Sequence, residues 1–246
     1  MGYGMSDYIE TNGTFTFAGI KSSTYDIWIN GSGTYGAAAR RHRDIVVPGR
    51  NGTLTIDEGS FEDVEVTYPA FIAKALGTNI ESFRNAIMAK QGYQRLTDTY
   101  HTDEFYRAKY MRGLEPDVIP AARGAAFDIV FKRDPRRFLT SGETTTNITS
   151  ATYSMTNPTL YPAKPLIEVT GYGQLTINSD VITIANTFAY VTIDCEIMDC
   201  YHGTDNANEQ VTFQSNDFPV LVPGTNSIAK ANTIMKVAIT PRWWIV

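Results

Sequence analysis

The sequence contains few of the residues on which reactive and metal-binding proteins depend. Its 246 residues include two cysteines and three histidines. His42, His101 and His202 stand far apart, and no Cys/His spacing typical of a zinc site occurs. Neither a Gly-x-Ser-x-Gly elbow nor a phosphate-binding loop ending in Gly-Lys-Ser/Thr is present. The sequence therefore predicts a protein that is not an enzyme and has no catalytic, cofactor or metal site.

Long apolar runs and a strong charge bias are also missing. No run approaches the roughly 18 apolar residues that span a bilayer. Residues 1–10 lack the basic-then-apolar pattern of a signal peptide. We therefore expect cytosolic synthesis and no membrane insertion. The formal net charge of −5 gives no reason to expect a nucleic-acid partner. The chain length suits one large or two medium domains.

The two cysteines do not predict a disulfide. If residues 194–200 form one strand, the odd separation of Cys195 and Cys200 places them on opposite faces. We expect two free, partly buried thiols.

Apolar and polar residues alternate through much of the chain, which indicates strands with one buried face. Such alternation occurs at 14–20, 25–30 and 127–132, and clusters of Gly, Asn, Asp and Pro separate the segments. The alternating apolar positions are Phe15 and Phe17; Tyr25, Ile27 and Ile29; and Phe127, Ile129 and Phe131. We expect a mainly β architecture.

One segment has helical spacing instead. Ile80, Phe83 and Ile87 recur on one helical face, and residues 78–81 have the spacing of a capping box. With Gly92 as the stop signal, these features predict one amphipathic helix over 79–91, packed on the sheet of a first domain. Residues 93–110 then predict a hairpin that turns at 101–104.

A change in composition divides the chain. From 140 to 157, 10 of 18 residues are Ser or Thr, which we interpret as a linker or a loosely ordered segment that leads into a second domain. We expect domains at 1–139 and 140–246. Short strand candidates follow at regular spacing and predict a β-sandwich: 166–170, 174–177, 181–184, 190–197, 211–213 and 235–239.

A glycine motif spanning Gly31, Gly33 and Gly36 resembles a dinucleotide fingerprint, with Asp57 downstream. The mechanism needs a helix after the last glycine. Here a run of arginines follows almost at once, without an apolar helical stripe. A loop between strands is the better interpretation, and no cofactor is expected.

The densest positive patch is formed by Arg40, Arg41, Arg43 and Arg50. It is either a solvated face or a surface that meets an acidic partner subunit, since arginine is favoured at interfaces.

Aromatic residues gather in the second half at Tyr161, Tyr172, Tyr201, Trp243 and Trp244. They could stack on sugar rings, although aromatics in a sandwich more often belong to the core or to an interface. The apolar end 241–246 should be tied down as a last strand.

Several motifs together resemble one family. The opening Phe15-Thr-Phe17-Ala-Gly19-Ile-Lys-Ser22 is one of them, and the turn Pro48-Gly-Arg-Asn-Gly52 is the most specific. The boundary at 134–138, the proline-rich segment after Asn157 and the C-terminal Pro-Arg-Trp-Trp follow in the same order. Across nearly the whole chain, these motifs resemble the distal tail proteins of long-tailed bacteriophages (siphophages).

This resemblance implies a β-rich N-terminal belt domain with one α-helix, six copies of which close into a ring. It also implies a C-terminal galectin-like or carbohydrate-module-like β-sandwich. The implied location is the tip of the virion tail, after assembly in the cytoplasm of the bacterial host. The implied partners are further copies of the chain, the tail tube protein, a tail-associated hub or lysin protein, and receptor-binding proteins. DNA would pass through the ring without specific binding.

Candidate residues follow from both lines of reasoning. A ring subunit should expose arginine and aromatic residues. Our ring-contact candidates are Arg40, Arg41, Arg43, Arg50, Tyr100, Phe105, Tyr106 and Tyr110. The alternative function is a carbohydrate-binding module or lectin that recognises glycans of the host cell surface. Its sugar or partner contacts would be Tyr172, Tyr201, Trp243 and Trp244.

Overall fold

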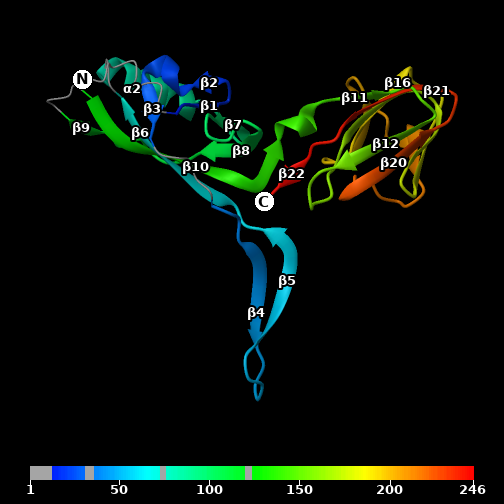
Figure 1. Cartoon of the computed structure of the whole chain (residues 1–246), viewed down its shortest axis with the longest axis horizontal. Helices are drawn as coiled ribbons and strands as arrows, with labels where there is room; N and C mark the ends of the chain where they lie inside the picture. Colours follow the sequence, from blue (N-terminus) through cyan, green and yellow to red (C-terminus); the bar gives the residue numbers. More distant parts are fainter. Residues whose placement is uncertain (1–12, 31–35, 73–75, 120–123) are drawn as a thin grey trace, which may run out of the picture. The chain divides into compact units, whose positions relative to one another are not determined.

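A computed structural model describes residues 13–30, 36–72, 76–119 and 124–246 of the chain (Figure 1). Its elements are mainly β-strands, which confirms the expected class. The chain divides into two compact units, one of residues 1–137 with Val246 and the other of residues 138–245. Within the described ranges, no helix is long and apolar enough to cross a membrane.

The first unit is built on one curled sheet. Its strands follow the order β2-β1-β7-β8-β10-β6-β3, and β9 also pairs with β10. An isolated bridge between Gly13 and Ile29 joins the start of the β1 segment to the edge strand β3. The sheet therefore curls around its own interior, and we call it the half-barrel. The strands are β1 (Phe15–Phe17), β2 (Ile20–Lys21), β3 (Ile27–Ile29), β6 (Val64–Ile72), β7 (Gln94–Asp98), β8 (Glu104–Tyr110), β9 (Asp117–Ile119) and β10 (Gly124–Leu139).

Aromatic side chains fill this interior. Phe131 lies at its centre, with ring centroids 5.6 Å from Phe15 and 5.0 Å from Phe17. Tyr68 stacks on Phe15 at 5.8 Å. All four side chains are at most 2% exposed, so the alternation in the sequence marked the buried face correctly.

The helix α2 (Leu76–Met88) packs on the same core through Phe83 and Ile87. The predicted bounds were wrong, because α2 begins before residue 79 and ends before residue 91. Thr78 therefore lies inside the helix and not at a cap. The apolar stripe begins earlier than we expected, with Leu76 partly buried against the core.

The predicted hairpin is confirmed as β7 and β8, which pair antiparallel. Asp98 fixes its turn, because one carboxylate oxygen accepts hydrogen bonds from the Tyr100 and His101 amides. The other oxygen accepts the Tyr68 hydroxyl at 2.7 Å. Burial and the Asp98 carboxylate raise the pKa of Tyr68 well above its ordinary value.

The second unit is a sandwich of two sheets. One has the order β11-β21-β13-β16-β17-β18 and the other β12-β20-β14-β15-β19, and a single apolar core lies between them. The strands are β11 (Thr146–Ile148), β12 (Thr152–Asn157), β13 (Leu166–Gly171), β14 (Gly173–Ile177), β15 (Asp180–Ile184), β16 (Tyr190–Asp194), β17 (Asp199–His202), β18 (Asp205–Asn206), β19 (Val211–Phe213), β20 (Gly224–Lys230) and β21 (Ile234–Thr240). The last strand, β22 (Trp244–Ile245), belongs to neither sheet and pairs with β10. Short 3₁₀ helices are η1 (Ser22–Tyr25) in the first unit, and η3 (Thr140–Glu143) and η4 (Asn208–Gln210) in the second.

Two expectations for this unit were wrong. Residues 140–157 are not a linker, because they form η3, β11 and β12, and both strands pair within the sandwich. Residues 194–200 are not one strand, because β16 ends at Asp194 and a turn leads into β17. Cys195 and Cys200 are nevertheless both free, as predicted, and both are buried.

The C-terminal segment is tied down, as its apolar character indicated. The Leu139 amide donates to the Trp243 carbonyl at 2.9 Å, and the Trp243 side chain belongs to the sandwich core. Arg242 holds Asp194 through two hydrogen bonds of 2.6 and 3.0 Å. Burial opposes ionisation of Asp194, but the bonds from Arg242 outweigh it, so the pKa of this carboxyl is lowered.

Candidate assembly surface

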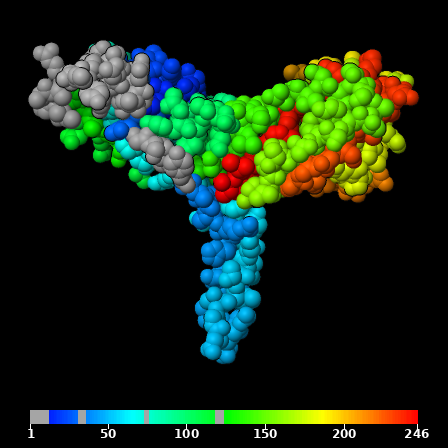
Figure 2. Space-filling model, viewed as in Figure 1, coloured from blue at the N-terminus to red at the C-terminus, as the bar shows by residue number. Residues whose placement is uncertain are grey.

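A two-stranded ribbon projects from the first unit (Figures 1 and 2). It consists of β4 (Arg40–Val46) and β5 (Thr53–Phe61), which pair with each other and form a sheet of their own. All of β4 is exposed, and so is β5 up to Gly59. We call this ribbon the arm.

The turn of the arm is formed by residues 48–52, the motif that most specifically resembles the distal tail proteins. The Arg50 amide donates to the Val47 carbonyl at 3.1 Å, and Gly49 has a φ of 79°. Proline at the second position and a glycine with positive φ at the third are typical of a type II turn. Gly52, with a φ of 80°, starts the return strand. The Pro-Gly-Arg-Asn-Gly motif is therefore the arm tip.

The two faces of the arm differ in chemistry. Residues directly opposite each other in an antiparallel pair share a face. Ile45 pairs with Leu54, and Arg43 pairs with Ile56. Ile45, Leu54 and Ile56 are 37%, 42% and 38% exposed and form the apolar arm face, with Arg43 beside them.

The opposite face carries mainly polar residues that pair within the arm, together with Val46, which is 78% exposed near the tip. Arg40 contacts Asp57 at 3.0 Å, and the Thr55 hydroxyl donates to Asp44 at 2.6 Å. The Gly59 amide, followed by Arg40, holds the pKa of Asp57 below its ordinary value. Arg40, one of our ring-contact candidates, thus has a partner in its own arm.

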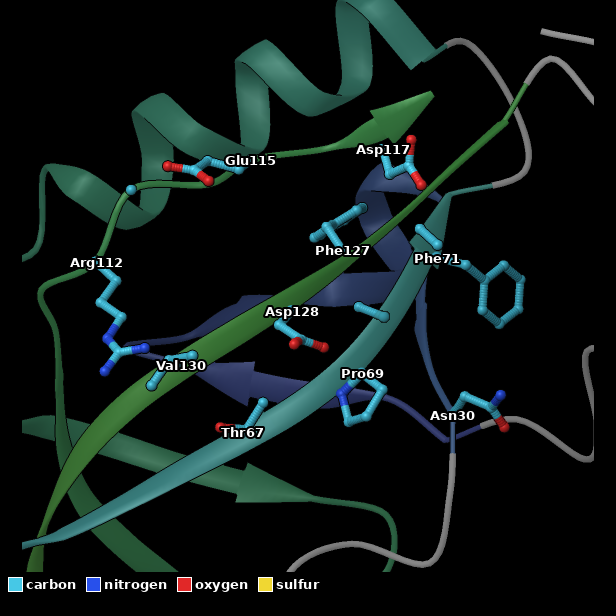
Figure 3. A pocket seen from close by; sticks show the side chains of 13 residues that line it. Asn30, Thr67, Pro69, Phe71, Arg112, Glu115, Asp117, Phe127, Asp128 and Val130 are labelled. Atoms are coloured by element: carbon cyan, nitrogen blue, oxygen red, sulfur yellow. The ribbon is translucent and has the colours of Figure 1, made fainter. Parts of the chain in front are cut away.

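A groove lies on the face of β6 and β10 that points away from the core (Figure 3). Thr67, Pro69 and Phe71 of β6 line it, with Ala126, Asp128 and Val130 of β10. The segment between β8 and β9 contributes Arg112 and Glu115 to its side, and β9 contributes Asp117. The volume is about 890 Å³.

The charge of this groove is negative. Asp117, Asp128 and Glu115 are exposed, whereas Arg112 is ion-paired with Glu65 at 3.1 Å. The floor carries apolar side chains of β6 and β10 together with the polar Thr67 and Asp128. Sequence reasoning missed the groove, although the single polar residue Asp128 between the buried Phe127 and Ile129 marked the outward face.

The aromatic residues that we expected at contacts between subunits are not exposed, which corrects our expectation. Phe105, Tyr106 and Tyr110 are 8%, 4% and 7% exposed and are buried by their own chain. Phe105 lies under the Arg95 guanidinium at 3.8 Å. Tyr100 is half-buried and donates its hydroxyl to the Ile29 carbonyl at 3.1 Å.

The buried Arg133 was not foreseen. It is 2% exposed, and its Nη2 donates to the Gly36 carbonyl at 2.8 Å, in the segment that leads into the arm. Its guanidinium lies 4.8 Å from the Tyr106 ring. Burial lowers the pKa of Arg133 and raises that of Tyr106 to about 12. Arg133 thus ties the root of the arm to the half-barrel.

The glycine motif lies only partly within the described residues. Gly31 and Gly33 lie outside them. Residues 36–39 are irregular, and β4 follows directly. The helix that a dinucleotide site requires is therefore absent from the described stretch 36–46.

The four sugar-contact candidates do not converge. Trp243 is 6% exposed in the core. Trp244 stacks on Tyr161 at 4.5 Å and donates to the Pro162 carbonyl. It lies beyond the end of β13 marked by Leu166, whereas Tyr172 follows the other end. The six residues of β13 separate the two by roughly 20 Å.

Tyr201 pairs with Thr192 on the outer face of its sheet. A smaller cleft of about 370 Å³ lies between η3, β11 and β12, with Trp243 in its lining. Tyr172, Tyr201 and Trp244 do not line it.

Comparison with known proteins identifies the fold. No protein-family model matches the chain, and no curated protein matches its sequence. Among solved structures, the crystal structure of SPP1 Dit (gp 19.1) protein matches 95% of this chain and 99% of its own, with a TM-score of 0.71 and 14% identity. That protein is described as a paradigm of the hub adsorption apparatus in phages that infect Gram-positive bacteria.

The phage p2 baseplate in its activated conformation with Sr matches 93% of this chain and 96% of its own, at a TM-score of 0.48 and 7% identity. The chain therefore has the fold of SPP1 Dit, and the family resemblance of its motifs is confirmed at the level of fold.

Proposed function

We propose that this chain is a structural subunit of a phage tail tip and not an enzyme. Six copies form a ring at the distal end of a long non-contractile tail. The ring joins the tail tube to the hub and to host-adhesion proteins. The observation that carries this proposal is the likeness to SPP1 Dit, which extends over 95% of the chain and includes both units.

The surface of the first unit supports self-assembly. A cyclic ring uses a heterologous interface, in which each subunit offers two different patches. The first unit carries two such patches, the exposed arm and the groove on β6 and β10.

Two buried carboxylates have structural roles that fit a non-enzymatic protein. Asp98 fixes the turn of a hairpin, and Asp194 is bound by Arg242. In the described part of the chain, no group of three or more His, Cys, Asp or Glu side chains is placed to hold a metal ion.

The partners and the location follow from the proposed role. The ring would contact further copies of itself, the tail tube protein, the hub or lysin protein and receptor-binding proteins. It would be assembled in the cytoplasm of the bacterial host and would reside at the tail tip. DNA would pass through its opening without specific binding.

The carbohydrate-binding alternative has less support. Its aromatic residues lie apart, and Trp243 is part of the core. An extended platform of aromatic rings is therefore not formed by these side chains.

The mass of the purified protein tests the proposal. Six copies of 27.3 kDa give a particle of about 164 kDa in light scattering. Negative-stain electron microscopy should show six-fold rings. A monomer at every concentration, without rings in virions, would refute the proposed function.

A further inference from the structure

The apolar arm face is flanked by an arginine, and the groove on β6 and β10 is lined by carboxylates. We propose that the arm of one copy lies in the groove of the next copy around the ring. This inference rests on the proposed function and names the two surfaces that close the ring.

The arm lacks a core of its own. A solitary two-stranded ribbon is marginally stable in water. Ile45, Leu54 and Ile56 stand in a row on one face, each more than a third exposed. The polar face already satisfies its charges through Arg40 and Asp57. The apolar arm face is therefore the one left to be covered.

The groove offers a ribbon apolar contacts beside polar ones, because Thr67 and Asp128 share its floor with apolar side chains. Its floor is the outer face of two paired strands, with Pro69 and Phe71 on β6 and Ala126 and Val130 on β10 (Figure 3). A ribbon laid on a sheet packs face to face at about 10 Å. The 890 Å³ of the groove leaves room for the side chains between the two layers.

The charges match this docking. Arg43 pairs with Ile56 and so flanks the apolar arm face. The groove presents Glu115, Asp117 and Asp128. Since Arg112 is paired with Glu65, no other cation lines the groove among the described residues. An arginine from outside is the partner that these carboxylates fit.

The occupant is a second copy, because the arm projects from its own half-barrel (Figures 1 and 2) and no residue of β4 or β5 is among those that line the groove. The nine residues of β5 span about 30 Å, and a ribbon is about 10 Å wide. One arm face thus offers roughly 300 Å², less than the roughly 800 Å² per partner of a stable pair. Closed rings, in which each copy gives and receives an arm, are favoured over free dimers.

Cysteine cross-linking tests the contact directly. The double variant Leu54→Cys with Val130→Cys, treated with a short bismaleimide, should give covalent products up to six subunits. Cys195 and Cys200 are 1% and 0% exposed and give little background. The control variant pairs Leu54→Cys with Met235→Cys, which is 66% exposed in the sandwich, and should give no such series.

Charge reversal gives an independent measurement. Arg43→Glu and Asp128→Arg should each raise the concentration for half-assembly by roughly tenfold. The double variant should recover most of that loss. Arg84→Glu, on the exposed face of α2, should leave assembly unchanged.

The outcomes separate the two proposals. A wild-type protein that forms no ring refutes the proposed function. A wild-type ring with no product from the Leu54 and Val130 pair, and no recovery in the charge-reversed double variant, refutes the docking and leaves the ring standing.

Discussion

Replacing the apolar arm face with serine should abolish assembly while leaving each chain folded. The variant carries Ile45→Ser, Leu54→Ser and Ile56→Ser. These side chains are not part of either core. Serine also keeps the backbone of the ribbon able to pair. The change therefore removes the apolar side chains that a partner would cover, and it should have little effect on the stability of the monomer.

The expected magnitude follows from the exposed fractions. Full burial of a leucine or isoleucine side chain contributes about 1.5–3 kcal/mol. About 40% of each of the three side chains remains to be buried. Each should contribute about 0.6–1.2 kcal/mol on docking, and the three together about 2–4 kcal/mol per arm contact. Because 1.4 kcal/mol is a factor of ten, each contact weakens roughly 30- to 700-fold.

Light scattering over a concentration series measures the loss, and thermal unfolding of the monomer checks the fold. A matched control replaces Leu160, Ile197 and Met235 with serine, since these are 87%, 63% and 66% exposed in the sandwich. The control should assemble as wild type. Normal assembly of the arm variant would refute the reasoning. So would a large fall in the monomer Tm, because it would show that this face supports the chain's own fold.

Three further predictions concern the second unit. Burial raises the pKa of Cys195 and Cys200 to about 12, so neither thiol should react with Ellman's reagent at pH 8 until the protein unfolds; prompt reaction would contradict their burial. Trp243→Ala should lower the free energy of unfolding by about 3–5 kcal/mol in urea denaturation. Unchanged stability would mean that the Trp243 side chain does not belong to the sandwich core. Asp194→Asn should cost about 2–4 kcal/mol at pH 7, because it breaks a largely buried pair with Arg242. The folded pKa of Asp194 is lowered, so this contribution is present above about pH 4 and is lost as the pH falls through the folded value. Denaturation at pH 7 and in acid should show that the free energies of unfolding of the variant and the wild type converge in acid. A difference that stays constant with pH would refute the pairing.

Sequence patterns located the strands that have one buried face. Phe127, Ile129 and Phe131 alternate with polar neighbours because β10 covers a core on one side only. Edge strands gave no such signal. In β12 only Met155 and Asn157 are buried, so its Ser- and Thr-rich sequence was interpreted as a linker.

The prediction that Phe105 and Tyr106 are exposed was wrong for a related reason. Phe105 and Tyr106 are adjacent in β8, and alternation places only one of them toward the core. Both are buried, because the Arg95 side chain covers Phe105 on the outer face. Such a cover comes from a neighbouring strand and leaves no trace in the local sequence.

Part of the candidate site could be predicted from the sequence. The Pro-Gly-Arg-Asn-Gly motif and the arginine cluster marked the arm, and the spacing of Ile45, Leu54 and Ile56 lies in the sequence. Which of these share a face depends on the register that the turn imposes. The groove brings together Thr67, Arg112 and Asp128 from three segments, so only the fold could reveal it.

The position of the arm decides what kind of assembly it can make. A heterologous contact closes into a ring only if the rotation between successive copies is fixed, and otherwise it extends into a filament. An arm on a loose tether would not fix that rotation. Here Arg133 binds the Gly36 carbonyl on one side of the arm root, and the Glu62 amide donates to the Ala39 carbonyl across it.

Holding the root in this way has an energetic cost. Arg133 is buried, and its Nε and Nη1 have no hydrogen-bond partner among the described residues. Unmet donors of a buried charged group are destabilising. A chain that needed only a stable half-barrel would gain from an apolar residue at this position. The arginine is understandable if the direction of the arm is what it secures, because a groove on the same half-barrel then meets the next arm at a constant angle.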